Sequence, residues 1–71
     1  MKTISIVIPC YNEEENVEVM ADSLRQLFQK ELSHYQYEIL FIDNDSQDTT
    51  REKIRRLCAE DKGIKGILNA K

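Results

Sequence analysis

Two short polar segments carry the side chains that are best suited to binding a ligand. The first, Pro9 to Glu13 (PCYNE), places an aromatic ring close to a carboxylate. The second, Asp43 to Asp48 (DNDSQD), is rich in short side chains that carry oxygen. An aromatic ring stacks on a nucleobase, and carboxylate or carboxamide oxygens accept its hydrogen bonds. On residue chemistry alone, the second segment is more often a helix-capping turn than a binding site, so both interpretations stay open.

Other kinds of chemistry lack the residues that they need. The glycine patterns of dinucleotide-binding and P-loop proteins are absent from the sequence. A calcium-binding EF-hand loop starting at Asp43 fails, because Asp48 stands where a glycine is required and Ile54 where a glutamate is required. The single histidine, His34, offers no credible Ser/His/Asp or Cys/His catalytic set, and we expect it in an exposed loop.

Three apolar runs predict the strands that position the two polar segments. Ile4 to Ile8 (ISIVI) is apolar and β-branched and ends at Pro9. Tyr37 to Ile42 (YEILFI) leads directly into the second polar segment, and Ile64 to Leu68 (IKGIL) is a short third run. Nearly continuous apolar runs are typical of strands that are covered on both faces in a parallel sheet.

Two helices are predicted between these strands. The first runs from about Glu13 to Leu32, with Asn12 as its N-cap and three glutamates in its first turn. Its apolar stripe is expected to pack on the sheet and contains Val17, Met20, Leu24, Leu27 and Phe28. The second helix begins near Thr49, which has capping-box spacing to Glu52, and it stops at Gly63. The apolar stripe of this helix contains Ile54, Leu57 and Cys58.

The order of these elements, β-α-β-α-β, predicts an α/β fold with a three-stranded parallel sheet. Right-handed crossovers between parallel strands give a three-layer, Rossmann-like half-sheet. In such sheets ligands bind beyond the carboxyl ends of the strands, which is where both polar segments lie.

Length and composition limit the function further. The 71 residues suffice for one small domain, and a domain of about 60 residues buries only about 60% of the surface of its unfolded chain. The chain has 10 basic and 13 acidic residues, which argues against nucleic acid or an anionic membrane as the main partner. Cys10 and Cys58 lack zinc-site spacing, and we expect them to be buried thiols. No signal peptide or membrane-spanning run is recognisable in the sequence.

Three segments of the sequence resemble family 2 glycosyltransferases. SIVIPCYNEEENV is similar to the first motif of that family, YEILFIDNDSQDTT to its second, and IKGILNAK to its third strand. The resemblance is strongest to the polyprenyl-phosphate sugar synthases. It covers the whole chain but only about the first quarter of such an enzyme. It implies that residues 1–71 are a single partial domain, the Rossmann-like amino-terminal part of a GT-A catalytic domain.

The resemblance also implies a nucleotide site. By similarity, Pro9 and Tyr11 enclose the base, and Glu13 contacts the nucleoside. Ile42 and Asn44 line the base site. The ligand would be the nucleotide of a UDP- or GDP-linked sugar. No residue of this chain is expected to be catalytic.

The second motif departs from the commonest family pattern. The family usually has Asp-Asp-Gly-Ser where this chain has Asp43, Asn44, Asp45 and Ser46. Asp43 and Asn44 are expected to contact the nucleotide, and Asn44 still offers a carbonyl oxygen as acceptor, but without charge. Asp45 replaces a glycine, so we expect this turn either to carry some strain or to use the tolerance of Asp for the left-handed region.

For the full-length enzyme, the resemblance implies inverting transfer of a sugar to polyprenyl phosphate. A divalent metal, Mg or Mn, is expected to stabilise the leaving diphosphate, held by an Asp-x-Asp motif that this chain lacks. Membrane association is expected only through segments downstream of this chain, with the full-length enzyme at the cytoplasmic face of the membrane. The 71-residue chain is expected to be cytoplasmic and inactive by itself.

A different class of function is also compatible with the sequence. The chain could be a small, non-enzymatic α/β association module that retains remnants of nucleotide-binding motifs. In the GT-A strand order a further strand pairs with the first one, so this chain leaves one edge of ISIVI unpaired. An apolar, uncharged edge is a template for pairing, and we therefore expect a homo-oligomer built on that edge or on the uncovered face of the sheet.

Overall fold

The structure, a computed structural model, describes residues 2–69 and contains three strands and two helices in alternation. In chain order these are β1 (Thr3–Cys10), α1 (Val17–Glu31), β2 (Gln36–Asn44), α2 (Thr50–Glu60) and β3 (Ile64–Asn69). The strands are parallel and lie in the order β1-β2-β3. This confirms the predicted α/β fold. The last two residues of the IKGILNAK segment lie outside the described residues.

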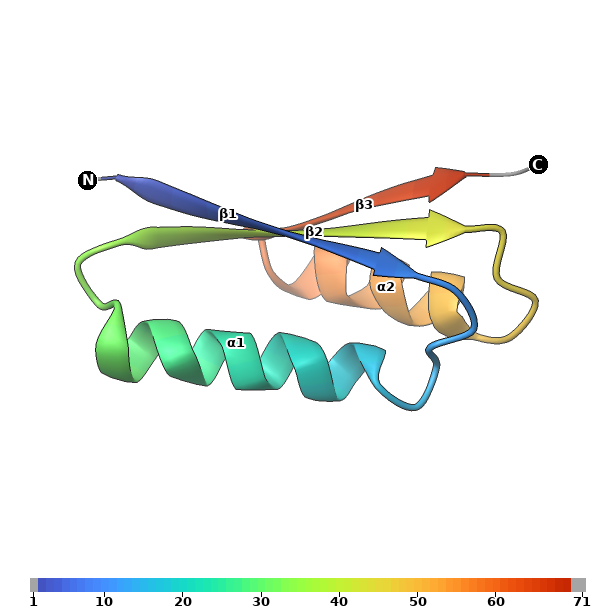
Figure 1. Cartoon of the computed structure of the whole chain (residues 1–71), viewed down its shortest axis with the longest axis horizontal. Helices are drawn as coiled ribbons and strands as arrows, with labels where there is room; N and C mark the ends of the chain where they lie inside the picture. The colour runs from blue at the N-terminus through green and yellow to red at the C-terminus, as the bar shows by residue number, and fades with distance from the viewer. Residues whose placement is uncertain (1, 70–71) are drawn as a thin grey trace.

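The described part of the chain has two layers rather than the predicted three. Figure 1 shows both helices on one side of the sheet, with the other face of the sheet uncovered. The strand order explains this, because two crossovers of the same hand that step in the same direction place both helices on the same face. The expectation of three layers was therefore wrong for these residues.

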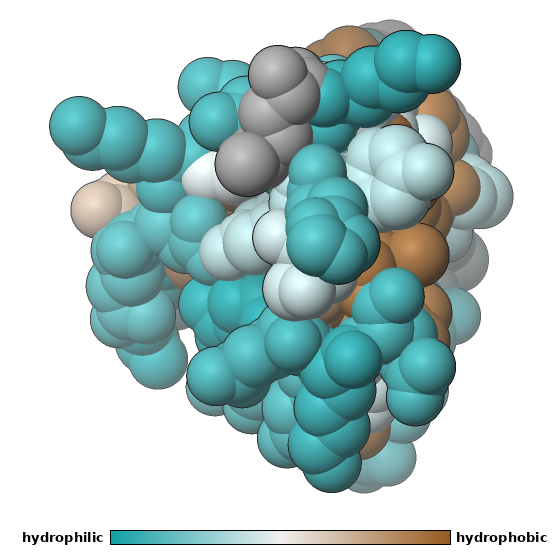
Figure 2. All heavy atoms as spheres, turned by 90° about the vertical axis from the view of Figure 1, so that its left-hand side faces the viewer, coloured by the Kyte–Doolittle hydropathy of each residue, from teal (hydrophilic) through white to brown (hydrophobic). Residues whose placement is uncertain are grey.

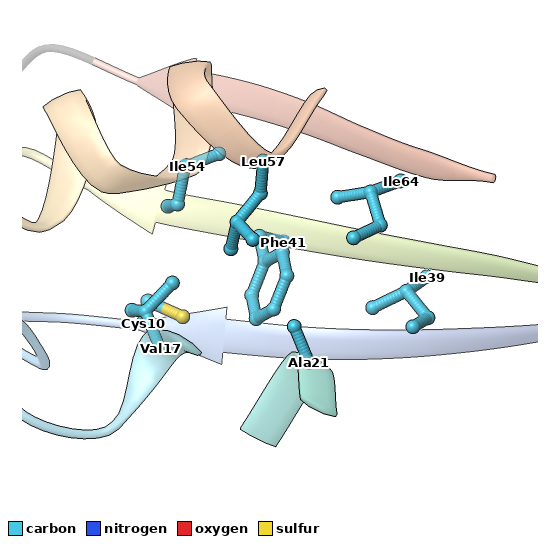
Figure 3. Close-up of a cluster of buried hydrophobic side chains, with 8 residues drawn as sticks. All are labelled: Cys10, Val17, Ala21, Ile39, Phe41, Ile54, Leu57 and Ile64. Carbon is cyan, nitrogen blue, oxygen red and sulfur yellow. The ribbon is translucent and has the colours of Figure 1, made fainter. Parts of the chain in front are cut away.

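The core lies between the sheet and the two helices. Alternate residues of β2 point toward the helices, and Ile39 and Phe41 are fully buried. Figure 3 shows the ring of Phe41 surrounded by side chains of β1, α1, α2 and β3. The buried cluster consists of Cys10, Val17, Ala21, Ile39, Phe41, Ile54, Leu57 and Ile64. Burial of the β2 and α2 positions agrees with the predicted apolar pattern.

Helix α1 differs from its prediction in two ways. It begins at Val17, not Glu13, because the N–H groups of Asn16 and Val17 bond to the Glu13 carbonyl in a turn. Asn12 is therefore not its N-cap. Leu27, expected in the core, is 43% exposed, whereas Ala21 is fully buried. The stripe that packs on the sheet is thus rotated slightly from the one that hydrophobicity alone indicated.

Cys10 and His34 lie as predicted, whereas Cys58, expected to be buried, is only half-buried. Cys10 is buried, Cys58 is half-buried, both are free thiols, and His34 is exposed in the turn before β2. Burial, together with the nearby charges of Glu13 and Asp43, raises the pKa of the Cys10 thiol to about 11.

A polar cluster closes the end of the sheet where the strands begin. Asp61 accepts hydrogen bonds from the Tyr37 hydroxyl, from Arg25 at 3.3 Å and from the Gly63 N–H at 2.8 Å. Burial alone raises the pKa of Asp61, but these hydrogen bonds and the charge of Arg25 hold it below its ordinary value. The cluster joins α1, β2 and the turn after α2, far from the two polar segments.

Candidate functional site

The two polar segments lie side by side at the carboxyl ends of β1 and β2. Cys10 and Asp43 are register partners near these ends. The β1–α1 loop (residues 11–16) follows Cys10, and the β2–α2 loop (residues 45–49) follows Asn44. Figure 1 shows both loops at the same end of the molecule, where the arrows of β1 and β2 point. Parallel pairing is the reason, because it brings the ends of successive strands to one edge.

Asn12 is the main link between the two loops. Its N–H donates to the Ser46 hydroxyl at 2.8 Å, and its side-chain oxygen accepts from the Gln47 N–H at 2.8 Å. Asn12 has φ of 51° and Asp45 has φ of 61°, so each loop has one residue in the left-handed region. Asn and Asp tolerate this region better than other non-glycine residues. The prediction of left-handed geometry at Asp45 is confirmed.

A second set of hydrogen bonds joins Glu14 to the start of α2. The Glu14 carboxylate accepts from the N–H of Thr49 at 3.1 Å and from its hydroxyl, and these bonds lower the pKa of Glu14. The Lys53 ammonium donates to the Glu14 carbonyl at 2.7 Å. The Glu13 N–H donates to the Thr50 hydroxyl at 2.8 Å. The β1–α1 loop is therefore held by the first turn of α2.

The predicted capping box at this helix start is not formed. Thr49 is the N-cap of α2, but its hydroxyl bonds to Glu14 and not to its own helix. Asp48 takes over the capping role, since its carboxylate accepts from the Thr50 N–H at 2.9 Å and from the Thr50 hydroxyl. Burial alone raises the pKa of Asp48, but its bonds to Thr50 hold it below the ordinary value.

Asp43 supports the site from inside the protein. It is fully buried, and its carboxylate accepts from the Ser46 N–H at 3.1 Å and from the Ser46 hydroxyl. Arg51 Nε lies 3.6 Å from the same carboxylate and forms an ion pair with it. Asp43 therefore fixes the shape of the β2–α2 loop and does not face solvent, in contrast to the other residues predicted to bind nucleotide.

The remaining predicted site residues line the solvent-facing side of this end. Pro9 and Ile42 are register partners on the uncovered face and form an apolar surface there. Pro9 is exposed, and Ile42 is half-buried. Tyr11 follows β1 and is 55% exposed. Asn44 is exposed at the end of β2, where its side-chain oxygen accepts from the Asn69 amide at 3.5 Å. Glu13 is half-buried and belongs to the same loop as Tyr11.

This arrangement offers two apolar side chains on the uncovered face, an exposed aromatic ring and several hydrogen-bonding groups at one edge. Such a combination suits a planar, polar ligand such as a nucleobase. These groups can bind and orient a ligand, and we assign none of them a catalytic role.

The residues present do not fit a divalent metal. Within residues 2–69, no group of three or more His, Cys, Asp or Glu side chains is placed to hold one. Asp43 and Asp45 have Asp-x-Asp spacing, but each lies 3.6 Å from a nitrogen of Arg51. A cation would have to displace that guanidinium, so we derive no reaction step through a metal here.

Sequence reasoning missed the residues that lock the two loops together. Asn12 was expected to cap α1, and Ser46 and Thr50 had no predicted role, yet all three bridge the loops. Their partners are more than 30 residues away in the sequence, so local spacing gave no signal. Only the side-by-side placement of the two loops reveals them.

Comparison with known proteins bears on this site. The model of glycosyl transferase family 2 matches residues 5–71. A putative glycosyltransferase, CsbB, from Bacillus subtilis (strain 168) is 44% identical over 64 residues, which is 90% of this chain and 19% of that protein. The bactoprenol glucosyl transferase of Shigella phage SfV is 40% identical over 82% of this chain and 18% of its own length. A dolichyl-phosphate beta-glucosyltransferase from Mus musculus is 33% identical over 80% of this chain and 18% of its own length. The chain thus spans about a fifth of the length of these relatives.

Proposed function

Because the chain belongs to glycosyl transferase family 2, we propose that it binds the donor nucleotide of a sugar-transfer reaction. Residues 1–71 would form a single partial domain, the nucleotide-binding part of a larger catalytic domain. The observation that carries this proposal is the pair of loops locked together at the carboxyl ends of β1 and β2. Ligands of open α/β sheets bind at this edge.

Each predicted site residue has a role in this proposal. Tyr11 stacks on the base, which rests against Pro9 and Ile42, and Glu13 accepts hydrogen bonds from the nucleoside. Asn44 bonds to the edge of the base with its carboxamide, which offers both an acceptor and a donor. Asp43 acts indirectly by holding Ser46, whose hydroxyl in turn receives the Asn12 N–H. The ligand is a nucleoside diphosphate sugar with uracil or guanine as its base.

The complete reaction that we propose is inverting transfer of a hexose to polyprenyl phosphate. A phosphate oxygen of the acceptor attacks the anomeric carbon, the bond from that carbon to the donor diphosphate breaks, and nucleoside diphosphate leaves. The names of the phage and mouse relatives, which specify bactoprenol and dolichyl phosphate, support a lipid acceptor. A Mg or Mn ion would supply Lewis acidity, held by residues other than those described here. The 71 residues alone bind nucleotide without transferring sugar.

The location follows from the acceptor. No helix among the described residues is long and apolar enough to cross a membrane. We propose that the site works at the cytoplasmic face of a membrane, where a water-soluble donor meets a lipid acceptor.

A second candidate function is self-association. It is favoured by one specific observation: among residues 2–69, β1 pairs with no strand other than β2, and Thr3–Cys10 carries no charge. Under this alternative the chain is a non-enzymatic module that forms a homo-oligomer through that edge. Transfer of sugar from any nucleotide donor by the 71-residue chain would exclude it as the sole function.

Nuclear magnetic resonance of the 15N-labelled chain, titrated with UDP and then with GDP, tests nucleotide binding. We expect shifts of the amide signals of Tyr11, Glu13 and Asn44. Amides at the opposite end of the sheet, such as those of Tyr35 and Gly63, should stay unchanged and serve as the internal control. Absence of shifts with both nucleotides at millimolar concentration would reject the proposal.

A further inference from the structure

The row of side chains that forms the candidate base site continues from β2 onto β3. Pro9 pairs with Ile42, and Ile42 pairs in turn with Ile67. Further along the strands, Asn44 of β2 is the register partner of Asn69 of β3. Side chains alternate between the two faces of a strand, so both asparagines lie on the same face as this apolar row. Two carboxamides therefore stand side by side next to the apolar surface of the site.

Arg51 ties together the backbone segments that carry the two asparagines. Its Nη1 donates to the Asn69 carbonyl at 3.4 Å. The same nitrogen lies 3.6 Å from the Asp45 carboxylate, and the Nε of Arg51 lies 3.6 Å from the Asp43 carboxylate. Asp43 and Asp45 flank Asn44, so one guanidinium joins the end of β2 to the end of β3. The planar fork of a guanidinium holds its acceptors in a fixed geometry, and the spacing of the two asparagines is thus set before a ligand arrives.

A hydrogen bond between the two side chains determines which groups they offer to a ligand. The Asn69 side-chain amide donates to the Asn44 side-chain oxygen at 3.5 Å. Each carboxamide has one oxygen as acceptor and an amino group as donor. Because the oxygen of Asn44 is directed at Asn69, the amino group of Asn44 points away from Asn69. One N–H group of the pair is used in this bond and roughly three remain, so the pair is rich in donors.

We infer that Asn69 is a positioning residue, which turns Asn44 so that the site selects uracil over guanine. Uracil has a carbonyl oxygen on each side of its N3–H, so acceptors outnumber donors on that edge. Guanine has one carbonyl oxygen beside its N1–H and its N2 amino group, so donors outnumber acceptors. A donor-rich pair complements uracil, whereas it sets N–H against N–H at guanine. The inference rests on the proposed nucleotide function and adds the choice of base to it.

Calorimetry with UDP and GDP tests this selectivity. The wild-type chain should bind UDP at least fivefold more tightly than GDP, because well-placed hydrogen bonds to a base edge discriminate between bases by that factor or more. Asn69→Ala leaves the Asn44 carboxamide free to turn over, so the ratio of the two affinities should fall below about twofold. Asn44→Asp replaces the amino group with a carboxylate, which accepts from both kinds of N–H on guanine, so the preference should reverse in favour of GDP.

Gln36→Ala is the matched control. It removes another exposed carboxamide from the sheet, but at the start of β2, at the opposite end from the site. Figure 2 views the molecule from that end, where hydrophilic residues cover most of the surface. Gln36→Ala should leave both affinities within about twofold of wild type. Circular dichroism checks the folding of every variant.

The side-chain amide signals of Asn69 give a second readout, which needs no variant and covers the case in which Asn69→Ala does not fold. In the 15N-labelled wild-type chain these signals should shift on addition of UDP, together with the backbone amide signals of Tyr11 and Glu13. The side-chain amide signals of Gln36 should stay unchanged.

The outcomes separate this inference from the proposed function. Three results would overturn the inference while leaving nucleotide binding intact: equal or tighter binding of GDP by wild type, an unchanged affinity ratio in folded Asn69→Ala, or Asn69 side-chain signals that stay still while those of Tyr11 shift. Failure of the wild-type chain to bind either nucleotide would instead reject the proposed function, and the inference with it.

Discussion

The geometry of Asn12 makes a quantitative prediction about how the two loops are held. Replacing Asn12 with alanine removes the acceptor for the Gln47 N–H. It also places at φ of 51° a residue that lacks the short polar side chain by which Asn lowers the cost of the left-handed region. Asn12→Gly removes the same acceptor but accepts the backbone conformation freely. The pair of variants therefore separates the side-chain hydrogen bond from the cost of the backbone conformation.

The magnitudes follow from the two contributions. The hydrogen bond is exposed, so its loss costs about 0.5–1 kcal/mol, the lower part of the usual range. The left-handed conformation costs an ordinary residue roughly 1–2 kcal/mol. Asn12→Ala should therefore lower the free energy of unfolding by about 2 kcal/mol and Asn12→Gly by about 1 kcal/mol. For a chain whose total stability is about 4–10 kcal/mol, both losses are measurable.

Urea denaturation followed by circular dichroism measures these differences. With a slope of about 1 kcal/mol per M of urea, the midpoint should fall by about 2 M for Asn12→Ala and by about 1 M for Asn12→Gly. Equal midpoints for the two variants would refute the role of the backbone conformation. A midpoint of Asn12→Gly equal to that of wild type would refute the contribution of the bond to Gln47.

Three further predictions concern the rest of the fold. Hydrogen bonds hold the pKa of Asp61 below its ordinary value of 3.8, so its contribution to stability is complete above that pH and is lost as the pH falls through the lowered value. Asp61→Asn should therefore flatten the loss of stability that urea unfolding records as the pH falls below 3.8. Gly63→Ala should lower the free energy of unfolding, measured with heat or urea, by about 1–3 kcal/mol. The reason is that an added Cβ would lie 2.6 Å from the Tyr37 ring and 3.0 Å from the Tyr37 carbonyl oxygen. An unchanged midpoint of unfolding would show that the ring moves aside freely. Cys10 is buried and its pKa is raised to about 11, so it should react with a thiol reagent at pH 8 far more slowly than half-buried Cys58. Peptide mass spectrometry can record both rates, and equal rates would contradict the burial of Cys10.

The elements of the fold were predictable because each depends on a local pattern. Apolar β-branched runs such as Ile4 to Ile8 indicated the strands, and their alternation with helices indicated that neighbouring strands are parallel. Helix ends were less predictable. Asn12 and Thr49 are good N-cap residues, but their side chains bond across the loops instead of to a helix, and the start of α1 moves to Val17 as a result.

In the candidate site too, local motifs predicted some features, whereas contacts between residues distant in the sequence determined others. Motif similarity indicated which segments form the candidate site. In these segments Tyr11 and Asn44 are exposed, so a ligand can reach them. The burial of Asp43 could not be read from the sequence, because it depends on Ser46 and Arg51 converging on one carboxylate. An acidic residue in a predicted binding loop can thus serve the shape of the loop and not the ligand.

The central claim is that the locked loops form a nucleotide site, and isothermal titration calorimetry with UDP and GDP tests it most directly. Tyr11→Ala is compared with Tyr35→Ala, which removes another exposed tyrosine at the opposite end of the sheet. Stacking on an aromatic ring contributes about 1–3 kcal/mol per base, so Tyr11→Ala should weaken binding at least fivefold. Tyr35→Ala should leave the affinity within about twofold of wild type. Failure of the wild-type chain to bind either nucleotide, or equal affinities for the two variants, would contradict the account.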